Sequence, residues 1–565
     1  MTEELEKRKT KILRFIKTRP SWFAYTVLFI IALFSYRVRT SNLGNLIDIT
    51  TQKHIPLALD PFVFLRYAKE LLANGSLAAI DTLRYFPNGY EQIGEFSLLT
   101  HFVVYLYKFL HIFNSAVTLE YVHIIYPALT FSLTLIFFFL LVRKLFDYRV
   151  GLLATAYLAV IPILLYRTLS GFSDKESLAL FLFVLTFYFY VSAWLAPKKS
   201  KSIVFGLLAG LVTGLMGLTW GGVQFAFLIL GLFGLIEIFL GKFTDNDFYT
   251  YASWSITAFI VIFSFSNRYT LNSFMSPTFG TGYFVLFFGL IYYLFRKYNF
   301  FNIKTKIDKK LPLGFFSFLV AFVLGFLFVI ITRGFSFITN TISAQFSVLT
   351  SPFAVSRWGV TVAESHQPYF LDLIGQLGKF YVFIFIVGSI FLFYNMVKNI
   401  KKHKYKLTIF YSLFILAFLF SRYSQSSVLN GSNNLSLILY LGSLFIFILG
   451  LFIFYLYAYR KEPETYQHIL NINKTYTLVF IWFLIKIIAA RSAVRLVLLL
   501  AFITVILAAY FFIKTLDFIL ERKNKIIKIV GVLLLLIILF NPSIHGSLTN
   551  YMTGTINTAK NVGVS

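Results

Sequence analysis

Long apolar runs dominate the hydrophobic pattern of this chain. Runs of about 20 apolar residues recur from residue 22 to residue 540, separated by shorter polar and basic segments, and each could cross about 30 Å of hydrocarbon. Lipid offers backbone N–H and C=O groups no partner, so these runs must be helices, and the alternating pattern of a membrane barrel is missing. The pattern predicts an all-α polytopic membrane protein with about 13 to 15 spans, each end placed to within about two to four residues.

The Lys and Arg residues predict the orientation, because basic loops stay in the cytoplasm. Residues 1–21 form a basic N-terminus, which we expect to be cytoplasmic, and the first span, about 22–36, has no small-residue cleavage site and is expected to be retained. Two long loops, about 37–117 and about 333–376, and the tail 541–565 then fall on the outer face. The inner basic loops contain Arg143 to Arg149, Lys198 to Lys201, Arg296 to Lys310, Lys398 to Lys406 and Arg522 to Lys528.

Composition excludes a soluble domain and several kinds of chemistry. The 565 residues are 58% hydrophobic and only 13% charged, whereas a water-facing surface needs far more polar residues. A net charge of +28 would suggest nucleic acid in a soluble protein, but here the cations set orientation and meet anionic headgroups, so we expect membrane lipid and no nucleic acid as partner. The absence of Cys excludes disulfides, thiolate metal sites and Cys nucleophiles.

The acidic residues give the central functional signal. Asp60, Asp174, Glu176 and Glu364 all fall on the predicted outer side, at or near membrane ends. Carboxylates beside lipid are costly and tend to persist where they bind a cation, a proton or a polar substrate. Their convergence on one face predicts a site there.

Each carboxylate also has a purely structural interpretation. Asp60 precedes Pro61, and an Asp in this position often only starts a turn or helix. Asp174 and Glu176 form a D-x-E pair, which can place two carboxylates around a hard divalent ion such as Mg²⁺ or Mn²⁺. The same pair could instead cap a helix and interact with its dipole.

The segment 361–368 lies in the second long outer loop and carries Glu364, with Thr361, His366 and Gln367 beside it. Such loops often form lids over a site. The alternative is that these are ordinary solvated residues, and a lone loop His is more often not a metal ligand.

Two further features lie at the predicted outer boundary. Arg491 and Arg495 are spaced i, i+4, which predicts that they share one face of a helix. They could bind a phosphate, snorkel to headgroups or pair with a helix acid. The tripeptide 220–222 (Trp220, Gly221, Gly222) marks a tight turn with an interfacial Trp, for which packing is the default interpretation.

The order of these motifs resembles the catalytic subunit of oligosaccharyltransferase in its archaeal form. The individual matches are weak, but the ordered set covers nearly the whole chain. It consists of Leu59-Asp60-Pro61, Asp81-Thr82-Leu83-Arg84-Tyr85-Phe86-Pro87-Asn88-Gly89, Ser170-Gly171-Phe172-Ser173-Asp174-Lys175-Glu176, Thr219-Trp220-Gly221-Gly222, Thr361-Val362-Ala363-Glu364-Ser365-His366-Gln367-Pro368 and Ala493-Val494-Arg495-Leu496.

The resemblance implies a C-type glycosyltransferase (GT-C) fold over 22–540, with about 13 transmembrane helices. The implied reaction moves an oligosaccharide from a lipid-linked dolichyl phosphate or diphosphate donor to Asn of an Asn-X-Ser/Thr sequon in an acceptor polypeptide. Carried over by position, Asp60, Asp174 and Glu176 would hold Mn²⁺ or Mg²⁺, and Asp60 and Glu364 would engage the acceptor amide. Arg495, and less directly Arg491, would meet the lipid phosphate, and the loop carrying Glu364 would close over the acceptor.

The chain departs from the family at its carboxyl end. The family's Trp-Trp-Asp motif lies in a soluble domain after the last span, and no two of the six Trp here are adjacent. Residues 541–565 are therefore expected to be the start of a soluble sequon-binding domain that is missing, with a separate polypeptide or accessory subunits as possible partners. The resemblance implies the plasma membrane of an archaeon as the location.

Two rival functions stay open. Another GT-C enzyme that uses a lipid-linked sugar would carry a paired acidic motif in its first outer loop, whereas Asp60 stands alone beside Pro61. A transporter or flippase would place polar residues near mid-membrane and often repeat its halves, and neither feature is evident here.

Overall fold

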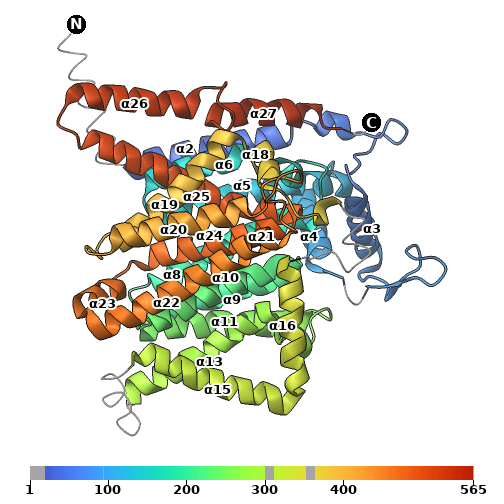
Figure 1. The fold of residues 1–565 in the computed structure, drawn as a ribbon. Helices are drawn as coiled ribbons and strands as arrows, with labels where there is room; N and C mark the ends of the chain where they lie inside the picture. Colours follow the sequence, from blue (N-terminus) through green and yellow to red (C-terminus); the bar gives the residue numbers. More distant parts are fainter. Residues whose placement is uncertain (1–19, 93–94, 299–310, 351–362, 564–565) are drawn as a thin grey trace.

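The computed structural model describes residues 20–92, 95–298, 311–350 and 363–563. Long helices run side by side through most of the molecule (Figure 1). Within the described ranges, 12 helices are long and apolar enough to cross a membrane, or 13 when one bent pair counts as a single span. This confirms the predicted polytopic, all-α architecture.

The spanning helices follow the apolar runs of the sequence. Two apolar helices are shorter than the 12 candidate spans: α20 (Lys404–Phe420) has 17 residues and α26 (Lys525–Phe540) has 16. The others are α2 (Pro20–Arg39), α5 (Leu119–Leu145), α8 (Lys175–Trp194), α9 (Lys199–Gly217), α10 (Gln224–Phe239), α11 (Asp245–Phe265), α13 (Pro277–Tyr298), α15 (Leu313–Arg333), α19 (Lys379–Val397), α22 (Ser443–Lys461), α24 (Lys474–Ser492) and α25 (Val494–Leu520), with the bent pair α6 (Tyr148–Val160) and α7 (Pro162–Thr168).

Burial separates the core helices from the peripheral ones. Helix α25 is buried along most of its length, and α5, α8 and α24 are largely buried as well. Helix α26 has no buried residue and α15 has few. Apolar side chains that stay exposed on long helices are those that face lipid, so α15 and α26 belong to the periphery of the bundle.

The two predicted outer loops contain ordered elements. The first includes α3 (Leu59–Asn74), α4 (Leu98–Phe113) and a short antiparallel pair, β1 (Ile80–Asp81) and β2 (Tyr90–Glu91). The second includes α16 (Phe335–Thr350), a 3₁₀ turn (Ala363–Ser365) and α18 (Phe370–Leu377). Helices α3 and α16 lie at the same end of the bundle (Figure 1). The remaining short helices are α12 (Leu271–Phe274), α21 (Asn434–Leu437), α23 (Pro463–Leu470) and α27 (Leu548–Asn561).

A helix break positions the segment that follows it. Helices α6 and α7 meet at an angle of 63° at Ile161, next to Pro162, which has no N–H to continue the helix. Arg39 Nη1 donates to the Ala159 carbonyl at 2.8 Å, and Thr555 Oγ1 on α27 donates to the Val160 carbonyl at 2.7 Å. Groups from two distant helices thus satisfy carbonyls at the break.

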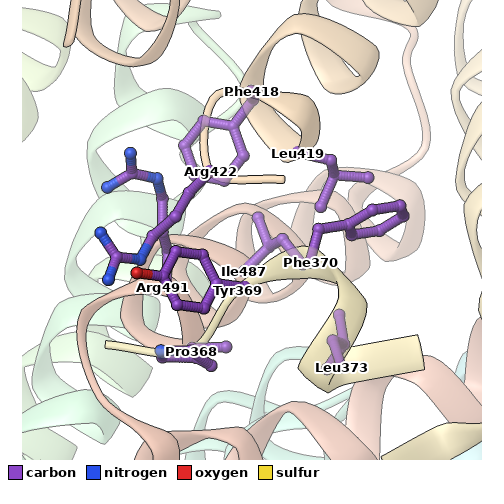
Figure 2. A pocket seen from close by; sticks show the side chains of 10 residues that line it. Pro368, Tyr369, Phe370, Leu373, Phe418, Leu419, Arg422, Ile487 and Arg491 are labelled. Carbon is purple, nitrogen blue, oxygen red and sulfur yellow. The ribbon is translucent and has the colours of Figure 1, made fainter. Parts of the chain in front are cut away.

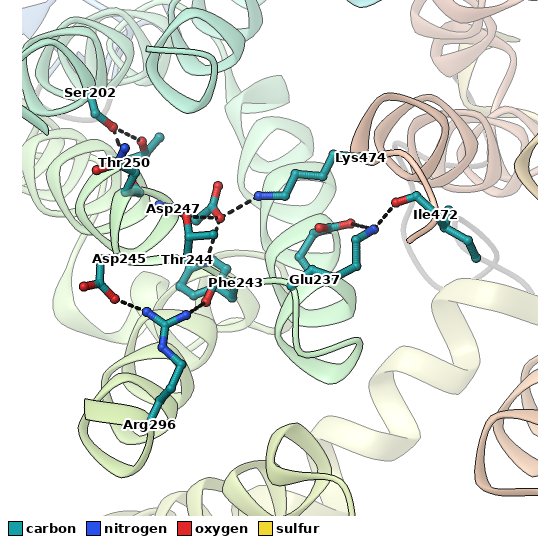
Figure 3. A network of polar contacts seen from close by, with 12 residues as sticks. Ser202, Glu237, Phe243, Thr244, Asp245, Asp247, Thr250, Arg296, Ile472 and Lys474 are labelled. Carbon is teal, nitrogen blue, oxygen red and sulfur yellow. Dashed lines mark hydrogen bonds and ion pairs between the residues drawn. The ribbon is translucent and has the colours of Figure 1, made fainter. Parts of the chain in front are cut away.

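Ion pairs join α11 to α13 and α24, and a third pair joins α10 to the turn that follows it (Figure 3). Lys474 Nζ on α24 lies 2.5 Å from Asp247 Oδ2 on α11, Lys242 pairs with Glu237 of α10 at 3.4 Å, and Arg296 of α13 pairs with Asp245. Each cation has its carboxylate, so this cluster is balanced in charge and holds the helices together.

Candidate active site

Carboxylates from distant segments line a single cavity of about 540 Å³. The cavity lies where α3, α8 and α25 begin and where the 3₁₀ turn of the second outer segment meets them. Its lining includes Asp60, Asp174, Glu176, Glu364, Arg167, Lys175, Arg268, Arg495, Phe96, Trp220, Gly221, Gly222, Phe225, Leu496 and Leu498. The predicted convergence of the four acids on one place is therefore observed.

Asp60 lies in the first turn of α3 and is exposed. The start of this helix is tied to the bundle by His123 of α5, whose Nε2 lies 3.0 Å from the carbonyl oxygen of Pro61. His123 is fully buried, so it fixes where the Asp60 carboxylate enters the cavity.

Asp174 and Glu176 occupy the N-cap and the first turn of α8. Asp174 Oδ1 accepts the Lys175 N–H at 2.7 Å, and the Tyr126 hydroxyl donates to the Asp174 carbonyl at 2.6 Å. The capping interpretation is thus correct, and the same residues also line the cavity. Burial raises the pKa of the Asp174 carboxyl, because a charge taken out of water loses hydration.

Gly171 lets the D-x-E segment approach the outer elements closely. Its φ is +88°, and a Cβ atom there would lie 2.7 Å from a methyl carbon of Leu46 and 3.0 Å from Leu57 Cγ. Its N–H donates to the Ile124 carbonyl at 2.9 Å. Only glycine satisfies both the backbone conformation and the space.

Arg167, at the end of α7, is the main residue of the cavity that the sequence analysis did not identify as functional. Its guanidinium forms an ion pair with Glu364 and lies 3.7 Å from Glu176 Oε1 and 4.0 Å from Asp174 Oδ2. It therefore supplies positive charge to three of the four carboxylates. In the sequence, an arginine at the end of a span indicates only the topology. Its role in the cavity becomes visible only in the structure, through the bend at Pro162.

Three other cations line the cavity. Lys175 Nζ lies 5.5 Å from the centre of the Phe96 ring, and the Arg268 guanidinium lies 4.5 Å from the same ring. Arg495 is exposed in the first turn of α25. With Arg167, four cations and four carboxylates face one cavity.

Arg491 and Arg495 do not share a helix face, so that prediction was wrong. Helix α24 ends at Ser492 and α25 begins at Val494, because Ala493 is extended (φ −159°, ψ 144°). The Val494 N–H donates to the His366 carbonyl at 2.9 Å instead of continuing the helix. Arg495 therefore lines the cavity with the acids, whereas Arg491 lines a different one.

The remaining predicted residues fall in three groups. Trp220 packs on Gly222, where a Cβ would lie 2.1 Å from the indole ring, so packing and cavity lining coincide in this turn. His366 and Gln367 do not line the cavity: His366 is exposed, and Gln367 Nε2 donates to the Thr350 carbonyl at 3.4 Å. Thr361 lies outside the described residues.

The donor chemistry of the cavity suits a hard divalent cation, although its present geometry does not form a cluster. Glu176 Oε2 is buried and has no hydrogen-bond partner in the described part of the chain, and oxygen donors are what Mg²⁺ and Mn²⁺ prefer. Among the described residues, however, no three His, Asp or Glu side chains come together closely enough to hold one ion. Arg167 instead lies against the carboxylates.

Comparison with known sequences matches the chain to one family. Residues 27–408, more than half of the chain, match the family described as "Oligosaccharyl transferase STT3, N-terminal". The dolichyl-phosphooligosaccharide-protein glycotransferase of Methanococcus voltae is 30% identical over 241 residues, which cover 38% of this chain and 26% of that protein. The STT3 subunit of the Saccharomyces cerevisiae dolichyl-diphosphooligosaccharide–protein glycosyltransferase is 29% identical over 112 residues, 20% of this chain and 15% of that subunit. The aligned part of this chain is thus a minor part of each relative's length.

Solved structures share the fold. The apo oligosaccharyltransferase of Archaeoglobus fulgidus superimposes with a TM-score of 0.65 at 18% identity, over 96% of this chain and 57% of that one. Structures of the same protein were solved with an inhibitory peptide and a dolichol-phosphate (TM-score 0.64, 17% identity, 97% and 57% covered) and with Zn and sulfate (0.58, 16%, 95% and 53%). This chain therefore spans about half the length of that structure, and the likeness shows that the two share the GT-C fold.

Proposed function

Because the chain belongs to the oligosaccharyl transferase STT3 family, we propose that it moves an oligosaccharide from a lipid-linked dolichyl phosphate or diphosphate donor to Asn of an Asn-X-Ser/Thr sequon. The observation that carries the proposal is the cavity that joins Asp60, Asp174, Glu176 and Glu364 from three distant segments with Arg495. Such a cavity offers carboxylates to an amide acceptor and a guanidinium to a phosphate leaving group.

Asp60 and Glu364 are the proposed partners of the acceptor amide. An amide nitrogen is a poor nucleophile because its lone pair is conjugated with the carbonyl. Two carboxylates that accept its N–H groups would weaken this conjugation and orient the nitrogen toward the sugar's anomeric carbon. Glu364 is half-exposed and its carboxylate meets Arg167, so acceptor binding would exchange that ion pair for hydrogen bonds to the amide.

A divalent cation, Mn²⁺ or Mg²⁺, is the proposed cofactor, held by Asp60, Asp174 and Glu176. When bound it would act as a Lewis acid that offsets negative charge on the departing phosphate. The buried, unpartnered oxygen of Glu176 supports this assignment. We expect Arg167 to withdraw from Asp174 and Glu176 when the cation enters, because the two positive charges compete for the same oxygens.

Arg495 is the proposed residue for the lipid phosphate. It lies in the first turn of α25, where the backbone N–H groups and the helix dipole also favour an anion. The segment that carries Glu364 would then act as the lid over the acceptor, with the His366 carbonyl joined to the first residue of α25.

The orientation of the chain and the membrane in which it lies are also proposed. The basic loops support an orientation with the N-terminus in the cytoplasm and the cavity on the outer face, and the proposed membrane is the plasma membrane of an archaeon. The tail 541–565 would lead toward a sequon-binding soluble domain, provided in the same or in a separate polypeptide.

The test is transfer of glycan from a purified lipid-linked oligosaccharide to a fluorescent sequon peptide, with and without an added soluble domain. Wild-type chain should glycosylate the Asn peptide and leave its Gln counterpart unmodified. E364Q should lower transfer at least about 100-fold, the cost of losing an interaction made in the transition state. E521Q, which changes an exposed acid remote from the cavity, is the matched control.

Two results would contradict the proposal. One is an absence of transfer under all conditions from a folded chain supplied with the soluble domain. The other is wild-type transfer by E364Q.

A further inference from the structure

A second cavity lies beside the segment that carries Glu364. It shares no lining residue with the cavity that the four carboxylates line, called the active cavity below. Its walls are apolar and come from α18, α20 and α24, and its polar end is formed by Arg422 and Arg491. Figure 2 shows the two guanidinium groups next to each other on one side, with apolar side chains on the other. The apolar lining consists of Phe370, Leu373, Phe418, Leu419 and Ile487.

Arg491 is a buried cation with incomplete hydrogen bonding. It is 8% exposed, and its guanidinium carbon lies 3.6 Å from the centre of the Tyr440 ring. Its Nε donates to Ser421 Oγ at 3.3 Å, and its Nη2 is buried with no partner. A hydroxyl and an aromatic face leave its full positive charge without a counter-ion.

Arg422 lines the same cavity and is half-buried; the Asp372 carboxylate of α18 acts on it electrostatically without forming an ion pair. Its Nη2 donates to the Gln367 carbonyl at 3.3 Å, its Nη1 donates to the Asn430 carbonyl at 3.4 Å, and its guanidinium lies 4.4 Å from the centre of the Tyr369 ring. Its Nε is buried with no partner. In the described part of the chain, no carboxylate lies within 4.0 Å of either guanidinium.

Two neighbouring cations in a poorly hydrated place repel each other, and buried charges in proteins are normally paired. In the network around Asp247 and Lys474, each cation has such an opposite partner. The missing component at Arg422 and Arg491 is therefore an anion. Guanidinium groups match the oxygens of a phosphate, which can accept from both forks at once.

The size and setting of the cavity narrow the identity of the anion. Its volume of about 40 Å³ holds roughly three waters at 10–15 Å³ each, which suits a small group such as a phosphate. Helix α20, which ends beside the cavity, exposes a row of apolar side chains for lipid: Ile409, Leu413, Leu416 and Phe420. A phosphate that carries an apolar tail fits both the cations and these surroundings.

We propose that Arg422 and Arg491 bind the phosphate of a membrane lipid at a site separate from the active cavity. Because Arg422 holds the Gln367 carbonyl and the Tyr369 ring, the bound lipid would also restrain the segment that carries Glu364. The inference stands on these contacts and does not depend on the proposed transfer reaction.

The experiment measures lipid binding, so its outcome is separate from glycan transfer. Purified full chain in detergent is titrated by native mass spectrometry with farnesyl phosphate, dioleoylphosphatidic acid, farnesol and inorganic phosphate. We expect one bound lipid phosphate that the R422M/R491M variant binds at least tenfold more weakly and that R495M retains. Either lipid phosphate bound in this way supports the site and identifies its source.

Controls separate a binding role from a purely structural one. R422K/R491K keeps both charges and should retain a large part of the binding, and R460M, on the inner end of α22, should bind as wild type. Equal binding of lipid phosphate by wild type and R422M/R491M, with the variant melting at the wild-type temperature, would overturn the proposal. Farnesol binding as tightly as farnesyl phosphate, or inorganic phosphate binding as tightly as the lipids, would also overturn it.

Discussion

At the scale of single residues, the character of the cavity lined by the four carboxylates depends on which charged side chains reach it. The convergence of the four carboxylates could be predicted because the basic loops indicate, independently of the acids, that these carboxylates share one side of the membrane. The place of Arg167 in the cavity could not be predicted, because it depends on the bend between α6 and α7. Arg491 was misplaced because the extended Ala493 interrupts the helix. Sequence spacing thus identified the residue types, and local backbone geometry decided which of them meet.

Arg167 provides a direct test of competition inside the cavity. Its guanidinium lies within 4.0 Å of both Asp174 and Glu176, so removing its charge should strengthen binding of a divalent cation. We expect R167Q to lower the Kd for Mn²⁺ by about tenfold, which corresponds to about 1.4 kcal/mol of relieved repulsion. Calorimetric Mn²⁺ titration is the measurement, and R522Q, in an exposed loop, is the control. An unchanged Kd in R167Q contradicts the competition.

Asp81 illustrates a motif residue whose role is structural. It is buried, and Arg66 and the Tyr67 hydroxyl, at 3.0 Å, both bond its carboxylate. The Arg66 guanidinium holds the pKa of Asp81 at about 2, below its usual 3.8. A lowered folded-state pKa means that the ionised carboxylate stabilises the fold above about pH 4 and that this contribution disappears as the pH falls toward 2.

D81N should therefore be less stable than wild type by about 2 kcal/mol at neutral pH, with the difference closing between about pH 4 and pH 2. Melting temperatures across that range measure it. E91Q alters an exposed acid on the neighbouring strand and should show no such dependence. A constant difference between D81N and wild type at all pH values argues against this account.

At the scale of elements, the long apolar helices were predictable and the shorter outer ones were not. Hydropathy shows spans because lipid demands about 20 apolar residues, whereas α3, α4 and α16 have 16 residues each. Helices α3 and α16 also mix polar with apolar residues, and α4 is apolar but short. The bend between α6 and α7 was also missed. Pro162 permits it, but the groups that stabilise it come from α2 and α27, over 100 residues away.

Arg39 provides the support from α2. Besides the Ala159 carbonyl, it donates to Ser35 Oγ and Thr168 Oγ1 at 2.8 Å each. R39M keeps the apolar stem but leaves these acceptors unsatisfied, which should lower stability by about 1–3 kcal/mol. Thermal unfolding in detergent tests this, with R37M, exposed on the same helix, as control. Equal melting temperatures for R39M and R37M would show that the bend holds without Arg39.

At the scale of the whole molecule, the cavity depends on the assembled bundle. Its acids come from α3, from the start of α8 and from the turn Ala363–Ser365, and its lipid-phosphate candidate comes from α25. Topological parity predicted that these segments share a side of the membrane. It could not predict their distances, which follow from how the largely buried α5, α8, α24 and α25 pack together.

A cation held between α3 and α8 should stabilise the entire fold. Ligand at 100 times its Kd adds about 2.7 kcal/mol, so saturating Mn²⁺ should raise the melting temperature by several degrees and EDTA should reverse the shift. Glycan transfer should stop with EDTA and return with Mn²⁺ or Mg²⁺. D174N should lose the Mn²⁺-dependent shift, while E521Q should retain it. Indifference of both melting and turnover to EDTA would exclude the cation.

The equal number of cationic and anionic side chains in the cavity has a thermodynamic consequence. Above the raised pKa of the buried Asp174 carboxyl, when all eight groups are ionised, the empty site is electroneutral, so a divalent guest leaves it with a surplus of two positive charges. A phosphate dianion then restores neutrality, and each guest must raise the affinity for the other by the same factor. The cation and the phosphate would therefore bind together as opposite charges, and each would bind more weakly without the other.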